Sequence, residues 1–145
     1  FGPFDFNFSR LIPSVLQCIA ENQSPELRSN GQFVRDFFYV HEAARVHLDL
    51  AEQLAASSDL AGEVFNFSHG VQLTVIEVVQ RLLDLAGLDL EPLVCDYTQH
   101  EIPSMWLDSS KARSELGWES QANFEDSLAL TVDWYLSYFR TGEIK

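Results

Sequence analysis

The segment from Thr74 to Gly87 limits the possible folds of this chain more than any other. Thr74 and Glu77 form the T-x-x-E pattern of a capping box, in which two residues bond each other's backbone N–H groups at a helix start. Gly87 stands where a helix ends on a left-handed residue. Between them the apolar residues recur at helical spacing: Val75, Val78, Val79, Leu82, Leu83 and Ala86. The segment therefore predicts an amphipathic helix with defined ends, and a chain with 46% hydrophobic residues can build the core that it packs on.

Four more segments have the pattern of helices. They span residues 10–22, 41–56, 109–116 and 123–139. Ser9 can provide the N-cap hydroxyl of the first, and Asp108 or Ser109 that of the third. The second has an apolar face made of Ala44, His47, Leu48, Ala51 and Leu54. We expect this face to be buried, with His47 as a hydrogen-bonded core histidine.

Short runs of aromatic and β-branched residues alternate with these helices. They span residues 26–28, 33–40, 63–68 and 91–95, and Asn30-Gly31 is a tight-turn dipeptide before the second run. The elements follow one another as helix, strand, helix, strand, helix, helix. This order predicts an α/β fold, a small mixed lobe of about five helices with a few short strands, in one domain over residues 1–145.

The charge and composition of the chain argue against several kinds of partner. Its 145 residues carry a net charge of -13, so nucleic acid is not expected as a partner. No apolar run approaches the roughly 18 residues of a membrane helix, so no membrane contact is expected. Two scattered cysteines, Cys18 and Cys95, form no disulfide framework and predict a reduced, cytoplasmic chain. An anionic ligand would have to be held by a few specific cations, because the chain has only 9 Lys and Arg residues.

The residue patterns of catalysis are missing from the chain. Its 4 histidines have no metal-ligand spacing with cysteine or carboxylate, so no metal is expected. There is no G-x-S-x-G motif and no Gly-rich phosphate loop. No tyrosine is followed by a lysine four residues later. We therefore expect no catalytic residue and no cofactor site in this chain itself.

Four blocks of sequence, in a fixed order, resemble a known family. They are "GQFVRDFFYVHEAARVHLDLAE", "GEVFNFS", "LTVIEVVQRLLDLAG" and "LDSSKARSELGW". Together they resemble the C-terminal part of NAD(P)-dependent nucleotide-sugar epimerases and dehydratases, the extended short-chain dehydrogenases/reductases. The segment "GPFDFNFSRLIP" is similar to the part that follows the family's catalytic half. The run "HEIPSMWLDSSKARSELGW" resembles the CDP-glucose 4,6-dehydratase branch most.

The resemblance implies a division of labour. In the family, an N-terminal Rossmann half carries the Gly-rich NAD turn and the Tyr-x-x-x-Lys pair, and a smaller C-terminal lobe binds the nucleotide diphosphate. This chain corresponds to the second half. The resemblance thus implies a truncated chain whose parent uses NAD or NADP, with a nucleotide-diphosphate sugar as substrate. The chain alone would bind no cofactor and would be inactive.

The resemblance gives Arg35 of "VRDF" the role of principal phosphate ligand. A guanidinium donates to phosphate oxygens through a planar, bidentate fork. One such group attracts an anion locally without making an acidic surface basic. The alternative is a structural ion pair of Arg35 with Asp36 or Glu42.

Five further residues are candidates for the same substrate site: Asn7, Ser9, Arg10, Leu11 and Arg28. Each has a structural alternative, namely a loop or cap role for the two polar residues, a solvated surface for the two arginines, and the core for Leu11. Many relatives carry a second phosphate-directed arginine before the acidic residue that matches Glu101. Here Tyr97, Gln99 and His100 precede it instead, so that second contact could come from Arg28 or from outside this chain.

The parent protein implied by the resemblance oxidises a nucleotide-linked sugar at C4 and then epimerises or dehydrates it. The alternative is a non-catalytic binding or interaction module that retains this lobe. A lobe without its Rossmann half exposes apolar surface, so we also expect a homo-oligomer. The predicted contact surfaces are the helix with Val40, Ala44, His47 and Leu48, and the aromatic segment 1–8.

Overall fold

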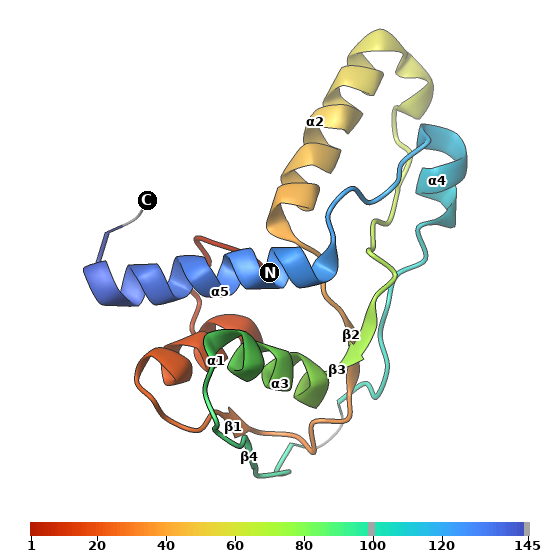
Figure 1. The fold of residues 1–145 in the computed structure, drawn as a ribbon. Coiled ribbons are helices and arrows are strands. Elements are labelled where there is room, and N and C mark those ends of the chain that lie inside the picture. Colours follow the sequence, from red (N-terminus) through yellow and green to blue (C-terminus); the bar gives the residue numbers. More distant parts are fainter. Residues whose placement is uncertain (99–100, 144–145) are drawn as a thin grey trace.

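The computed structural model describes residues 1–98 and 101–143, and Figure 1 shows their arrangement. They form a mixed α/β lobe of helices and short strands, which confirms the predicted fold class. The elements are α1 (Leu11–Ala20), β1 (Glu26–Leu27), β2 (Val34–Asp36), α2 (Val40–Ala56), the 3-10 helix η1 (Ser58–Leu60), β3 (Gln72–Thr74), α3 (Val75–Ala86), β4 (Leu93–Val94), α4 (Ser110–Leu116) and α5 (Phe124–Thr141).

The main core lies where α1, α3 and α5 pack together (Figure 1). We call the buried residues of these helices and of the adjoining strands the main core: Ile12, Val15, Leu16, Ile19, Leu27, Leu73, Val78, Val79, Leu82, Leu83, Phe124, Leu128, Val132 and Tyr135. The helix predicted from the capping box is confirmed as α3. The Thr74 N–H donates to Glu77 Oε2 at 2.8 Å, and the Glu77 N–H donates to Thr74 Oγ1 at 3.3 Å. Gly87 ends α3 in the left-handed region, with φ of 68°.

Two small sheets flank the main core. The parallel pair β1–β4 matches Glu26 with Leu93, and the antiparallel pair β2–β3 matches Arg35 with Leu73. The segment around Ser104 extends the second sheet, because the Val34 N–H donates to the carbonyl of Pro103 at 2.9 Å. Residues far apart in sequence therefore meet at β2.

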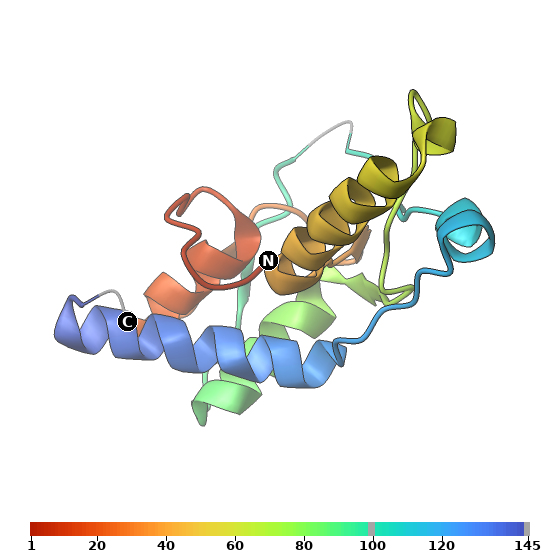
Figure 2. The ribbon, with the colours of Figure 1, turned by 90° about the horizontal axis from the view of Figure 1, so that it is seen from above.

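A second region, the arm, leads away from the main core (Figures 1 and 2). We define the arm as α2, the segment 57–68, α4 and the segment 117–121. Its small core consists of Val46, Ala112 and Trp118, with partly buried apolar neighbours that include Phe65 and Phe67. The arm thus rests on a much smaller apolar core than the rest of the chain.

The prediction that the apolar face of α2 is buried is wrong. Leu48 is 66% exposed, and Ala44, His47, Ala51 and Leu54 are exposed as well. The face that is buried carries Glu42 and Val46 instead. The reason is that the arm's small core lies against that other face, while nothing in the described part of the chain covers the apolar one. His47 is therefore a surface residue, with its Nδ1 2.6 Å from the carbonyl of Ala43.

Two further predictions are wrong. The run 63–68 forms no strand, because its Phe65 and Phe67 pack into the arm's small core and β2 pairs with residues 72–74. Ser9 does not cap α1, because its hydroxyl and its N–H both donate to Asn7 Oδ1. The N-cap residue is Arg10, and no side chain caps the helix.

Candidate functional site

A cleft of about 350 Å³ opens between α1 and the strands β1 and β2. We call it the arginine cleft, and its lining residues are Ser9, Arg10, Leu11, Ser14, Val15, Glu26, Leu27, Arg28, Ser29, Arg35, Phe37, Val75 and Glu101. Three arginines and two glutamates among them give a local formal charge of +1, in a chain with a net charge of -13. The cleft is therefore a place where this acidic chain can hold an anion.

Arg35 is held in a fixed orientation at the edge of β2. Its Nη1 donates to the carbonyls of Val34 at 2.9 Å and Ile102 at 2.8 Å, and its Nη2 donates to Glu101 Oε2 at 3.2 Å. Its guanidinium also lies 5.5 Å from the ring centre of Phe33. A guanidinium has five N–H donors, and these bonds use three of them, so the others stay available for a ligand. The ordering of the side chain before binding reduces the entropy lost when an anion binds.

The ion-pair partner of Arg35 is thus Glu101, and the expected alternatives Asp36 and Glu42 are wrong as partners. Asp36 Oδ2 accepts from the Leu107 N–H at 3.1 Å. Glu42 accepts from Arg45, with Arg45 Nη2 2.8 Å from Glu42 Oε2. The ion pair does not by itself decide the role of Arg35, because a carboxylate can also keep a binding arginine in place.

Arg10 and Arg28 line the same cleft, and they differ in whether the guanidinium has an ion-pair partner. Arg10 Nη1 donates to Asp5 Oδ2 at 3.0 Å, on a side chain that is 66% exposed. Arg28 is exposed, and its guanidinium has no ion-pair partner among the described residues. Its backbone is fixed, because its carbonyl accepts from the Tyr97 N–H at 2.9 Å. Arg28 is consequently the cation of the cleft that is most available to a ligand.

The start of α1 adds to the positive potential. The first N–H groups of a helix have no intrahelical acceptor and carry a partial positive charge. In α1 no side chain caps them and no acidic residue stands in the first turn. Arg10 and Leu11, at this helix start, both line the cleft. The N–H of Leu11 therefore lies beside the arginines, while the N–H of Arg10 donates to the carbonyl of Asn7.

The remaining predicted residues divide into two groups. Ser9 and Leu11 lie in the cleft lining, and Leu11 also packs against the main core. Asn7 does not line the cleft but accepts from the Ser9 N–H at 3.1 Å, so it shapes the loop before α1. Of the three residues that replace the family's second arginine, Gln99 and His100 lie outside the described residues.

Sequence reasoning missed Glu26 as a cleft residue. The pattern around Leu27 could have revealed it. In an extended segment, the side chains before and after a buried residue point away from the core. Glu26 and Arg28 are both exposed while Leu27 is buried. The third replacement residue, Tyr97, donates its hydroxyl to Glu26 Oε1 at 2.9 Å.

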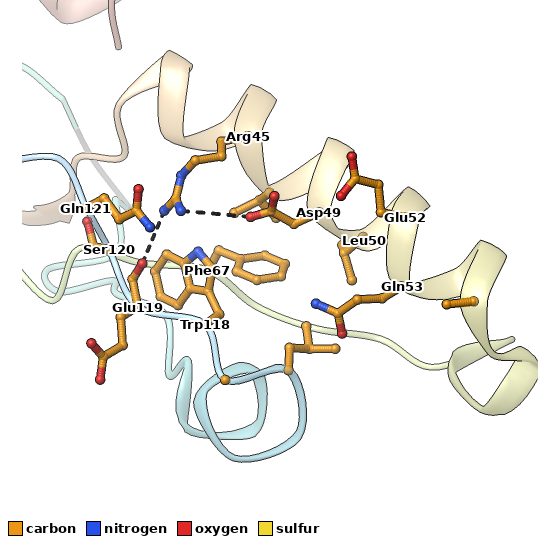
Figure 3. A pocket seen from close by; sticks show the side chains of 14 residues that line it. Arg45, Asp49, Leu50, Glu52, Gln53, Phe67, Trp118, Glu119, Ser120 and Gln121 are labelled. Atoms are coloured by element: carbon orange, nitrogen blue, oxygen red, sulfur yellow. Dashed lines mark hydrogen bonds and ion pairs between the residues drawn. The ribbon is translucent and has the colours of Figure 1, made fainter.

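A second cavity, of about 570 Å³, lies in the arm between α2 and the segment 116–121 (Figure 3). Arg45 is its cation, and Figure 3 shows its guanidinium between the Asp49 side chain and the backbone of Glu119. The carboxylates of Asp49, Glu52 and Glu119 outnumber it, so the local formal charge is -2. Although larger, this cavity is unsuited to an anion.

Two other site types find no support in the described part of the chain. No group of three or more His, Cys, Asp and Glu residues there could hold a metal ion. None of its helices is long and apolar enough to cross a membrane.

Comparison with known proteins places this chain beside nucleotide-sugar enzymes. The family model "GDP-mannose 4,6 dehydratase" matches residues 4–131. A dTDP-glucose 4,6-dehydratase of Streptomyces niveus is 31% identical over 137 residues, which are 93% of this chain and 39% of that protein. The UDP-glucose 4-epimerase 3 of Oryza sativa is 26% identical, over 87% of this chain and 36% of that protein.

Solved structures agree in fold. The UDP-glucose 4-epimerase of Thermotoga maritima, determined with UDP-glucose, has a TM-score of 0.80 at 26% identity, over 98% of this chain and 43% of that chain. The dTDP-glucose 4,6-dehydratase of Bacillus anthracis, in complex with NAD, has a TM-score of 0.77 at 26% identity, over 94% of this chain and 42% of that chain. The chain thus spans about two fifths of the length of the relatives that it matches.

Proposed function

Because the chain belongs to the nucleotide-sugar epimerase and dehydratase family of extended short-chain dehydrogenases/reductases, we propose that it is the substrate-binding part of such an enzyme. The arginine cleft would hold the diphosphate of a nucleotide sugar. The observation that carries this proposal is the meeting of Arg10, Arg28 and Arg35 at one cleft in a chain of net charge -13.

Each part of the cleft has a chemical role in this proposal. Arg35, already ordered by its bonds to two carbonyls and Glu101, presents its free N–H groups to a phosphate oxygen. Arg28, without an ion-pair partner among the described residues, supplies the second cation. The start of α1 offers the backbone N–H of Leu11, whereas that of Arg10 already donates to the carbonyl of Asn7 at 3.0 Å. Charge-assisted bonds of this kind are about twice as strong as neutral ones.

The chemistry at the sugar would lie outside this chain. NAD or NADP would accept and return a hydride in the parent enzyme. This chain has no Gly-rich strand–turn–helix for a dinucleotide and no Tyr-x-x-x-Lys pair, so its residues do not fit that cofactor. We therefore assign substrate binding to the chain, place the oxidation at C4 in the parent, and expect a cytoplasmic enzyme.

The uncovered face of α2 is consistent with a parent enzyme in which this chain packs against an N-terminal half. Leu48, Leu54 and Val40 are exposed apolar residues on one helix, and an amphipathic helix normally buries such a stripe. In the parent enzyme an N-terminal half would cover it, and in the isolated chain a second copy would. The alternative function, a binding module without catalysis, uses the same cleft. It differs from the enzyme in having no Rossmann half with an NAD turn and a Tyr-x-x-x-Lys pair.

Calorimetric titration of the 145-residue chain with UDP, CDP and their nucleosides tests the proposal. We expect saturable binding of the diphosphates that weakens with salt, and much weaker binding of the nucleosides. Arg28→Ala should weaken diphosphate binding about tenfold, whereas Arg113→Ala, at an exposed arginine of α4, should leave it unchanged. Equal binding of nucleosides and diphosphates would contradict a diphosphate site.

A further inference from the structure

Two of the three arginines in the arginine cleft already have a carboxylate at ion-pair distance. Arg35 Nη2 lies 3.2 Å from Glu101 Oε2, and Arg10 Nη1 lies 3.0 Å from Asp5 Oδ2. Arg28 has no ion-pair partner among the described residues. Much of the positive charge of the cleft is therefore compensated before any ligand binds.

The charge that remains for a ligand is small. The lining residues have a local formal charge of +1, and the carboxylate of Asp5, paired with Arg10, lowers this to zero. An anion in the cleft still receives charge-assisted hydrogen bonds from the guanidinium groups. Each further negative charge on that anion meets the carboxylates as well as the arginines, so it adds repulsion. The cleft therefore suits an anion that combines many acceptor oxygens with few charges.

Glu101 shares a nitrogen of Arg35 with the position of a bound phosphate. The two N–H groups of Arg35 Nη1 donate to the carbonyls of Val34 and Ile102, and one N–H of Nη2 donates to Glu101. The open donors are the Nε–H and the second Nη2–H. Two acceptors on one such nitrogen lie about 5 Å apart, so a phosphate oxygen at the open Nη2–H would be held close to the charge of Glu101.

The charge of the ligand depends on what is attached to its terminal phosphate. A phosphate with one ester or anhydride link carries close to two negative charges above pH 7, because its second pKa is about 6. A phosphate with two such links carries one. The diphosphate of a nucleotide sugar thus has about two charges, a free nucleoside diphosphate about three and a triphosphate about four. These compounds offer similar phosphate oxygens to the cleft and differ in charge.

We propose, on the basis of the proposed diphosphate site, that Glu101 makes the arginine cleft select nucleotide sugars over free nucleoside diphosphates and triphosphates of the same base. In a cleft of uncompensated arginines, affinity would rise with the charge of the ligand. The Glu101 side chain is 40% exposed, so water screens its charge. At about 5 Å, such a screened charge still weakens binding by about threefold to tenfold for each further charge on the ligand.

The competing account is that Glu101 only holds Arg35 in place. Glu101→Gln separates the two accounts, because its amide oxygen can still accept from Arg35 Nη2 while the negative charge is gone. If holding Arg35 is the whole role, the substitution affects every phosphate ligand alike. If the charge of Glu101 selects, ligands with more charges gain more affinity from its removal.

The test is calorimetric titration of the 145-residue chain with UDP-glucose, UDP and UTP at pH 8 without divalent cations, in the wild type and in Glu101→Gln. The wild type should bind UDP-glucose most tightly. In Glu101→Gln the affinity relative to UDP-glucose should rise about threefold for UDP and about tenfold for UTP. Comparing these ratios between variants cancels the contacts of the glucose and the base. Glu125→Gln, which removes the carboxylate of the Arg81–Glu125 ion pair outside the cleft, is the matched control and should keep the wild-type ratios.

Three other outcomes are decisive. If Glu101→Gln changes the affinity for all three ligands by the same factor, Glu101 does not select by charge and the assignment is wrong, while the diphosphate site stands. If the wild type binds UTP more tightly than UDP-glucose, the assignment is wrong in the same way. If none of the three binds to folded wild-type protein, the proposed diphosphate site and the assignment are both overturned.

Discussion

The main core and the arm use amphipathic helices in opposite ways. In α3 the apolar stripe is fully buried, with Val78, Val79, Leu82 and Leu83 at 0% exposure. In α2 the apolar stripe faces outward, and the helix is held through its other side by a small core and by Glu42. An uncovered apolar stripe is the kind of surface that a partner can bury, whereas the stripe of α3 is already buried in the main core.

The largest expected effect is the loss of a side chain from the main core. Leu82→Ala should reduce the free energy of unfolding by about 2–5 kcal/mol, because the cavity it leaves cannot fully collapse. The same change at Leu48 in α2 should alter it by less than about 0.5 kcal/mol. Urea unfolding of both variants measures the contrast. Similar losses at the two positions would show that the face of α2 is already covered.

The next effect concerns the polar contacts inside the arm, between α2 and the segment 117–121. Glu42 is buried, and it accepts from Arg45 and from the Gln121 N–H at 3.2 Å. Burial raises the pKa of this carboxyl, and the bonds from Arg45 and Gln121 outweigh that and lower it. Glu42→Ala should cost about 2–3 kcal/mol, because it removes the nearest carboxylate of the partly buried Arg45 and the acceptor of the Gln121 N–H.

Amide hydrogen exchange can locate that loss. Faster exchange should appear in α2 and α4 while α1, α3 and α5 keep their protection. Glu52→Ala, at an exposed position of the same helix, serves as the control. Uniform acceleration across the whole chain would contradict a separate arm.

A smaller effect is expected from pH at His69, which joins the start of α2 to the segment 117–121. Its Nε2 accepts from the Tyr39 N–H at 3.0 Å, so its Nδ1 carries the proton and donates to Ser120 Oγ at 2.6 Å. Burial lowers the pKa of His69 below its ordinary value of 6.5. The unfolded chain then binds the proton first, so the stability contributed by neutral His69 is present above pH 6.5 and is lost as the pH falls below it.

Urea unfolding at a series of pH values from 8 to 5 measures this loss. His69→Gln keeps an acceptor for the Tyr39 N–H and a donor for Ser120, and it should flatten the stability profile below pH 6.5. An unchanged profile in the variant would assign the pH dependence to other groups.

The smallest effect on stability should come from changes on the uncovered face of α2. Leu48→Lys should leave the free energy of unfolding nearly unchanged, since the side chain is exposed. It should nevertheless reduce self-association of the chain, because a charge interrupts the apolar stripe. Light scattering over a concentration series compares the two. A wild-type chain that stays monomeric at high concentration would show that this face does not mediate association.

The sequence predicts the parts of this fold whose signals are local. The capping box at Thr74 and the left-handed Gly87 lie within a few residues of the helix that they define, and the structure has both. The burial of α2 is not local. Its stripe was correctly identified as apolar, but which face is covered depends on what lies against it. Strand formation is not local either. The run 63–68 has the composition of a strand, but no strand pairs with it in the described part of the chain.

The candidate site was predictable in its cations and not in its carboxylates. Arg10, Arg28 and Arg35 were named as candidates through the resemblance to the family, and the fold brings all three to one cleft. Glu101 as the partner of Arg35 is a contact across 66 residues, which no local pattern encodes. Glu26 was missed because it belongs to a strand of only two residues, too short for alternation to stand out.

The central claim is that the arginine cleft binds the diphosphate of a nucleotide sugar, and Arg35 tests it most directly. Calorimetric titration of CDP and UDP into wild type, Arg35→Ala and Arg35→Lys, with thermal unfolding of each, is the measurement. We predict that Arg35→Ala weakens binding about tenfold to a hundredfold and that Arg35→Lys recovers only part, because an ammonium lacks the bidentate fork. A lowered melting temperature with unchanged nucleotide affinity in Arg35→Ala would contradict the claim, and would leave Arg35 as the structural partner of Glu101.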